Sequence, residues 1–183
     1  MKSLLRFEQV ALRRGGRLLF DGLDLALGSG EALQVKGPNG TGKSSLLRLA
    51  AGLLRPERGR IERSALALAD DNLALDRELP LRRALGFWGG DIGEAMNALG
   101  IEDLAEVPVR LLSSGQAKRA TLARVAASSA PLWLLDEPLN ALDAGGVKRL
   151  ATLVTGHRER GGAVVAASHQ PLPGEWQALE LGA

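Results

Sequence analysis

Apolar and polar residues alternate along two segments near the start of the chain. The alternation covers residues 4–12 and 18–27, and the turn Arg-Gly-Gly-Arg at 14–17 separates them. In the second segment Leu23, Leu25 and Leu27 share one face. A period of two is typical of strands with one buried face, and glycines between two such strands indicate a tight turn. The pattern therefore predicts an N-terminal antiparallel β-subdomain.

Three later runs are apolar or nearly so and too short for helices. They lie at 32–36, 132–135 and 163–167. A continuous apolar run of this length is typical of a parallel strand that is buried on both faces. We expect these three segments to form the centre of a sheet.

Helical periodicity fills much of the remaining chain. Residues 44–54 are apolar almost all round, residues 144–160 are helical in pattern, and Ile92, Ala95, Met96 and Leu99 recur at helix spacing before Gly100. No strand is evident from about residue 70 to 110, which we interpret as a small inserted helical lobe. Strands alternating with helices predict an α/β fold with a mainly parallel sheet, in a single domain covering 1–183.

Composition narrows the class of protein. The chain has 183 residues, of which 45% are hydrophobic, and 23 basic against 21 acidic side chains, with no cysteine. The absence of cysteine excludes disulfides, thiol catalysis and cysteine-bound metals. The sequence contains no stripe of basic residues interleaved with aromatics, so it does not favour nucleic-acid binding. No apolar run approaches the roughly 18 residues that span a bilayer, so we expect a protein that is soluble when isolated or held at a membrane by partners.

A phosphate-binding loop is the strongest chemical signal. The segment GPNGTGKS matches the pattern G-x-x-x-x-G-K-[ST] and lies between a predicted strand and a predicted helix. Its glycines let backbone N–H groups surround phosphate oxygens, while the lysine reaches the β- and γ-phosphates and the serine hydroxyl binds Mg²⁺. The predicted nucleotide-binding residues are Gly37, Pro38, Asn39, Gly40, Thr41, Gly42, Lys43, Ser44 and Ser45.

Two acids end the apolar run LWLLDE. Asp136 and Glu137 would lie at the carboxyl end of a buried strand, where ligands bind in open α/β sheets. Asp136 suits the Mg²⁺ shell together with Ser44, and Glu137 suits polarisation of an attacking water. Two solvated acids at a strand end are the alternative, which the nearby phosphate-binding loop makes less attractive.

A second anion-binding feature lies at the start of a later helix, in LLSSGQAKRA. Exposed N–H groups at a helix N-terminus, flanked by hydroxyls, can bind an anion. An ordinary serine-capped helix would explain Ser113 or Ser114 but not the whole arrangement.

The order GPNGTGKS, LSSGQ, LLDEP, NALD and SHQ resembles the ATP-binding subunits of ABC transporters, over essentially the whole chain. The resemblance implies ATP and Mg²⁺ as ligands and a head-to-tail pair of ATPase subunits. It also implies that Ser113, Ser114, Gly115 and Gln116 contact the ATP of the other subunit, and that Asp143 lies at the dimer seam. His169, an unremarkable histidine on its own, would be a catalytic residue that senses the γ-phosphate.

A closer resemblance involves longer segments. FDGLDLAL, LQVKGPNGTGKSSLLRLAAGLLRP, LLDEPLNALDAGGV and HQPL are similar to the haem-exporter ATPases of bacterial cytochrome c maturation. This implies ATP hydrolysis coupled to haem delivery, with integral membrane transporter subunits as partners, on the cytoplasmic face of the inner membrane. It implies no nucleic-acid partner and no direct haem binding by this chain.

The chain departs from the family pattern at two positions. Arg14 stands near the place of an aromatic residue that stacks on adenine; a guanidinium can also stack on a base, or Arg14 is a plain turn residue. The family's glutamine before the helical lobe is missing from LALADDNLAL, where Asp71 is either a substitute ligand for Mg²⁺ or water, or a loop residue.

Other functions fit the sequence less well. A small-molecule P-loop kinase shares the size and fold but has no use for LSSGQ followed by NALD. A soluble ABC ATPase acting on DNA or ribosomes would need coiled coils, tandem domains or basic arms. An ABC ATPase for another small-molecule cargo remains open, because the cargo route would lie in the membrane subunits.

Overall fold

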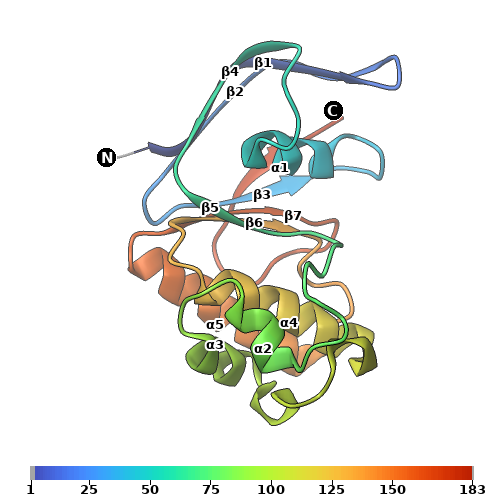
Figure 1. Cartoon of the computed structure of the whole chain (residues 1–183). Coiled ribbons are helices and arrows are strands. Elements are labelled where there is room, and N and C mark those ends of the chain that lie inside the picture. The colour runs from blue at the N-terminus through green and yellow to red at the C-terminus, as the bar shows by residue number, and fades with distance from the viewer. Residues whose placement is uncertain (1–2, 183) are drawn as a thin grey trace.

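An antiparallel sheet forms the upper layer of the molecule in Figure 1. The computed structural model describes residues 3–182. Strands β1 (Ser3–Arg14) and β2 (Arg17–Gly28) form a long hairpin, and β4 (Arg58–Arg63) pairs with the other edge of β1. The predicted hairpin is confirmed, because the alternation places leucines on the inner face while Gly15 and Gly16 supply the positive φ that the turn requires.

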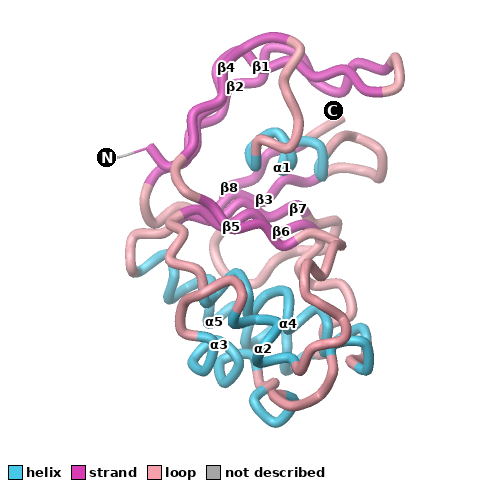
Figure 2. Tube along the Cα trace, in the orientation of Figure 1, coloured by secondary structure: helices cyan, strands magenta, loops and turns pink. Residues whose placement is uncertain are grey.

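A parallel sheet of five strands forms the middle layer. Its order is β5-β6-β7-β3-β8, and Figure 2 shows all five strands side by side. The central strands β6 (Leu132–Asp136), β7 (Ala163–Ala167) and β3 (Ala32–Lys36) are the three that the apolar runs predict. Asp136 pairs with Ala167, and Ala167 pairs with Val35, so the carboxyl ends of the three strands meet at one edge.

Helix α1 (Lys43–Ala51) lies between the two sheets (Figure 1). Its apolar residues are not confined to one face, because one side packs on the antiparallel sheet and the other on the parallel sheet. Leu46, Leu47 and Leu49 are all buried in the core that these three elements share.

Longer helices cover the other face of the parallel sheet. They are α4 (Ser114–Ala127) and α5 (Ala144–Glu159), with a second core beneath them. Leu132 and Leu134 of β6 point into the core around α1, whereas Trp133 and Leu135 point into the second core. Strand β6 is therefore apolar at every position before Asp136 because each of its two faces packs into a different core.

The segment from residue 70 to 110 packs outside α4 and α5. It contains α2 (Leu81–Gly86), α3 (Ile92–Leu99) and single 3-10 turns at Glu102–Leu104 and Val109–Leu111. Asp91 caps α3 by accepting a hydrogen bond from the Glu94 N–H, and Gly100 ends it in the left-handed region at φ 63°. Ala95, Met96 and Leu99 are buried on its inner face, as the spacing predicts.

Three strands escape sequence analysis. They are β4, β5 (Leu66–Ala69) and β8 (Gln177–Glu180), and all three lie at sheet edges. Strands β4 and β8 have no continuous apolar run, and β5 is apolar but only four residues long. Edge strands such as these are held mainly by backbone hydrogen bonds to their single neighbour. Within residues 3–182 no helix is long and apolar enough to cross a membrane.

Candidate active site

The phosphate-binding loop connects β3 to α1 and folds around its own lysine. Lys43 Nζ donates hydrogen bonds to the carbonyls of Gly37, at 2.7 Å, and Pro38, at 3.1 Å. Thr41 Oγ1 also donates to the Pro38 carbonyl, at 2.9 Å. The ammonium is therefore held at the loop by weak neutral acceptors, which phosphate oxygens would replace favourably.

Two glycines of the loop have no tolerance for a side chain. Gly37 has φ 139°, and a Cβ there would lie 2.4 Å from the Leu181 carbonyl oxygen. Gly42 has φ 106° and lies close against Leu19. The residue after β8 and the hairpin therefore both lie close against the loop, which favours glycine at these two positions.

Two hollows adjoin the loop. One of about 640 Å³ lies between the loop, the start of α1 and the hairpin turn, and one of about 390 Å³ lies between the loop and the end of β6. Glu137 and Asn39 line both. Arg14 lines the larger hollow, and its Nη1 lies 3.4 Å from Ser45 Oγ, which places a guanidinium beside the loop as stacking on a base would require.

Asp136 is buried beside the loop with one oxygen unpaired. Its side chain is 5% exposed, and Oδ1 has no hydrogen-bond partner. Burial raises the pKa of Asp136, and a hydrogen bond from the Ser44 hydroxyl opposes the shift. A buried carboxylate oxygen without a partner, facing a hydroxyl, fits a hard divalent cation.

Among the described residues, no three His, Asp or Glu side chains are arranged as a metal cluster. Mg²⁺ at phosphate sites needs only one or two protein ligands beside the phosphates, so Ser44 and Asp136 suffice. Asp71 is exposed but lies close enough to Asp136 for its charge to raise the pKa of that carboxyl. It remains a candidate third ligand.

Glu137 and His169 meet directly. His169 Nδ1 lies 2.9 Å from Glu137 Oε2, with side chains 51% and 20% exposed. Glu137 also has φ 43°, an uncommon conformation for a residue with a side chain. The turn after β6 thus holds Glu137 in an uncommon backbone conformation beside both hollows.

Gln34 contacts the backbone on both sides of His169, and the sequence motifs do not point to it. It is 3% exposed on β3, and its Nε2 donates to the Gln170 carbonyl at 2.7 Å and to the Ser168 carbonyl at 3.5 Å. These two carbonyls flank His169. A polar residue inside the otherwise apolar segment Ala32–Val35 was the signal that could have found it.

The signature residues lie at the N-terminus of α4. Ser113 and Gln116 form a capping box, in which each side chain accepts a hydrogen bond from the backbone N–H of the other. Ser114 is exposed, and a Cβ on Gly115 would lie 2.8 Å from the Ala141 carbonyl oxygen. Asp143 caps α5 by accepting from the Gly146 N–H at 2.7 Å.

The signature residues do not reach the phosphate-binding loop of their own chain. Of the described residues that line the two hollows, none belongs to the segment 113–116. The predicted site residues therefore fall into two groups, one around the loop and one at the starts of α4 and α5.

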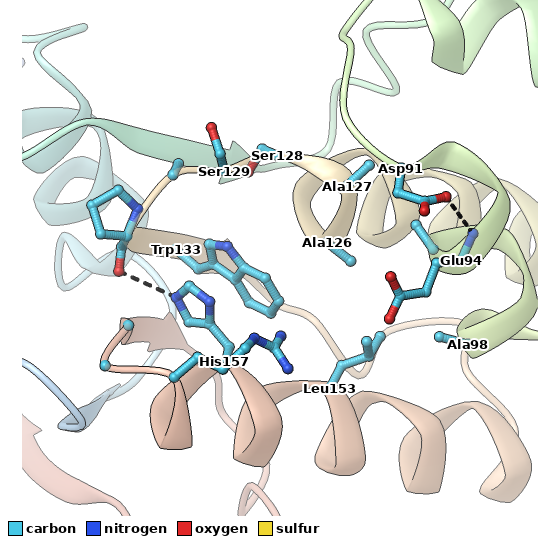
Figure 3. Close-up of a pocket in the computed structure, with 16 residues that line it drawn as sticks. Asp91, Glu94, Ala98, Ala126, Ala127, Ser128, Ser129, Trp133, Leu153 and His157 are labelled. Carbon is cyan, nitrogen blue, oxygen red and sulfur yellow. Dashed lines mark hydrogen bonds between the residues drawn. The ribbon is translucent and has the colours of Figure 1, made fainter.

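A third hollow, of about 490 Å³, lies at the amino end of β6 (Figure 3). The indole of Trp133 stacks on the His157 ring with centroids 3.8 Å apart, and His157 Nε2 lies 3.2 Å from the Pro131 carbonyl oxygen. Asp91, which caps α3, and Glu94 in its first turn lie across the hollow from this pair. The hollow is at the opposite end of β6 from Asp136, so it is separate from the nucleotide site.

Comparison with known proteins agrees with this geometry. The family model described as "ABC transporter" matches residues 20–140. A cytochrome c biogenesis ATP-binding export protein CcmA from Sphingopyxis alaskensis is 53% identical over 177 residues, covering 92% of this chain and 91% of that protein. The CcmA protein of Novosphingobium aromaticivorans is 56% identical over 166 residues, covering 89% and 87%.

Solved structures share the architecture. A metal-chelate type ABC transporter in an inward-facing conformation superimposes with a TM-score of 0.84 at 26% identity, covering 99% of this chain and 80% of that chain. Fold, motif order and sequence relatives converge, and the chain belongs to the ABC transporter ATP-binding proteins, in the family of the cytochrome c biogenesis export ATPases.

Proposed function

We propose that this ATPase works as a head-to-tail pair that drives a haem exporter for cytochrome c biogenesis, peripherally on the cytoplasmic face of the bacterial inner membrane. One observation carries the pairing. Lys43, Glu137 and His169 line the two hollows beside the loop, whereas residues 113–116 at the start of α4 line neither of them. A second copy in head-to-tail orientation would supply the missing helix N-terminus to the γ-phosphate.

The chemistry follows from the residues at the loop. Lys43 leaves its two carbonyl partners to bind the β- and γ-phosphates, and Arg14 stacks on the base. Glu137 orients the attacking water and takes its proton as the water oxygen bonds to the γ-phosphorus. The bond from the γ-phosphorus to the bridging oxygen breaks in the same step, and ADP leaves. Mg²⁺, held by Ser44 and Asp136 with Asp71 as a further candidate, would neutralise charge on the phosphates.

His169 has a second task in this scheme. In the structure it holds Glu137 Oε2, and with ATP bound it would turn its ring toward the γ-phosphate and release the carboxylate to water. The fixed backbone at Ser168 and Gln170 limits this change to the side chain.

This chain has an exposed aromatic face on which membrane subunits could dock. Phe87 is 85% exposed and Trp88 45% exposed, and their rings meet edge to face. The two adjoining rings form a small exposed apolar patch, and contiguous apolar patches are the surfaces at which proteins meet partners. Gly90 follows, touching Ala127 at the rim of the 490 Å³ hollow, where Asp91 and Glu94 offer carboxylates to a basic cytoplasmic segment.

Sedimentation of Glu137→Gln with and without MgATP tests the pairing. Blocked hydrolysis should trap a dimer, and Ser114→Arg in the same background should bind ATP yet stay monomeric. A Glu137→Gln protein that binds MgATP and stays monomeric both alone and with its membrane subunits would contradict the proposal. Copurification with the subunits of a haem exporter, and loss of mature c-type cytochromes with Lys43→Ala, test the cargo.

A further inference from the structure

Lys118 connects the signature helix to the acids of its own chain. It lies on α4, one helical turn after Ser114, and its Nζ donates a hydrogen bond to the Asp136 carbonyl at 3.0 Å. Burial lowers the pKa of Lys118, while the charges of Asp71, Asp136, Glu137 and Asp70 oppose that shift. A half-buried ammonium thus lies among the acids at the carboxyl ends of β5 and β6.

Helix α4 touches this segment twice. Beside the Lys118 bond to Asp136, Gly115 packs against the Ala141 carbonyl in the turn that follows Glu137. The first two turns of α4 therefore contact both ends of the segment 136–141. A shift of either element must move the other or break these contacts.

We propose that Lys118 is a positioning residue that couples the two ATP sites of the pair. The inference depends on the proposed head-to-tail function. In that arrangement the acids near Lys118 serve the ATP of their own chain, whereas Ser114 on the same helix serves the ATP of the partner. Lys118 transmits the state of one site to the other through α4.

The chemistry of the contact suits this task. A lysine ammonium forms a charge-assisted bond to the carbonyl and at the same time is attracted by the neighbouring carboxylates. Phosphates and Mg²⁺ arriving beside Asp136 change that local charge balance, so the pull on Lys118 differs between the ATP-bound and free states. A purely apolar packing contact would not respond in this way.

Mixed dimers separate this coupling from a local effect. A wild-type subunit is paired with a differently tagged Glu137→Gln subunit, so that only one of the two sites can hydrolyse ATP. This live site combines the phosphate-binding loop and Glu137 of the wild-type subunit with the signature helix of the variant subunit. Adding Lys118→Met to the Glu137→Gln subunit should then lower kcat at the live site at least about tenfold. The KM of the mixed dimer for ATP, and the affinity of each isolated subunit for ATP, should stay within about twofold of the values without Lys118→Met.

Controls keep the experiment decisive. Lys118→Arg in the same subunit should restore most of kcat, because a guanidinium can donate to the same carbonyl, and Lys148→Met on the exposed face of α5 should have no effect. Normal kcat at the live site with Lys118→Met would overturn the coupling, even if the variant impairs its own site. Failure of the pair to form at all would instead count against the head-to-tail function.

Discussion

Single residues at the carboxyl ends of β3, β6 and β7 decide what this site can do. Asp136 and Glu137 follow from the motif, but their surroundings do not. The unpaired Oδ1 of Asp136 and the bond between Glu137 and His169 depend on neighbours more than thirty residues away in sequence. The sequence motifs therefore predict the chemical groups, whereas the partners that orient them, such as Gln34, become visible only in three dimensions.

Gln34→Leu should impair catalysis without affecting nucleotide binding. It removes the donor that holds the carbonyls on either side of His169, so His169 should lose its fixed position, and kcat should fall roughly 10- to 100-fold. ATP affinity, measured by fluorescent nucleotide titration, should not change. Gln177→Leu on the exposed strand β8 is the matched control; equal kcat for the two variants would refute the positioning role.

Whole elements were predictable where their pattern reflects burial. The hairpin, the three central strands and α3 each bury a regular set of apolar side chains, and each lies close to its predicted bounds. Strand β4, with sequence RGRIER, is mostly exposed and charged, so its pattern resembles that of a loop. Its position is set by pairing with β1, which is information that local sequence does not contain.

Gly115→Ala, at the start of α4, should favour helix formation but weaken the dimer. Alanine favours an isolated helix by about 1 kcal/mol over glycine. Here its Cβ would meet the Ala141 carbonyl, so the helix start must move away from the turn before Asp143. We expect ATP-dependent dimerisation of the Glu137→Gln protein to weaken at least about tenfold while monomeric ATP binding is kept.

Gly86→Ala in α2 is a suitable control for that measurement, since a Cβ there meets nothing within 4 Å. If both substitutions leave the dimer intact, the contact between α4 and the turn has no part in pairing.

At the scale of the whole molecule, one sheet separates two cores. Strand β6 contributes to both, and the second core ends at the Trp133–His157 stack. Burial lowers the pKa of His157. The unfolded chain therefore binds this proton at a higher pH than the folded protein does.

The free energy of unfolding should consequently fall as the pH drops below about 6.5, the ordinary pKa of histidine. His157→Phe keeps a ring against Trp133 but cannot titrate, so its melting temperature should decline less between pH 8 and pH 5. Asp136, whose raised pKa acts in the opposite direction, is common to both proteins and cancels in the difference. Parallel pH profiles would show that His157 does not carry the effect.

The three tryptophans differ in exposure, so intrinsic fluorescence can report on one face of the molecule. Of the three tryptophans, Trp133 is 3% exposed, Trp88 is 45% exposed beneath the guanidinium of Arg124, and Trp176 is half-buried. Solvent quenchers should reach Trp88 first. A partner that covers the aromatic face should then shift its emission to the blue and shield it from acrylamide, so docking can be followed by intrinsic fluorescence without a label.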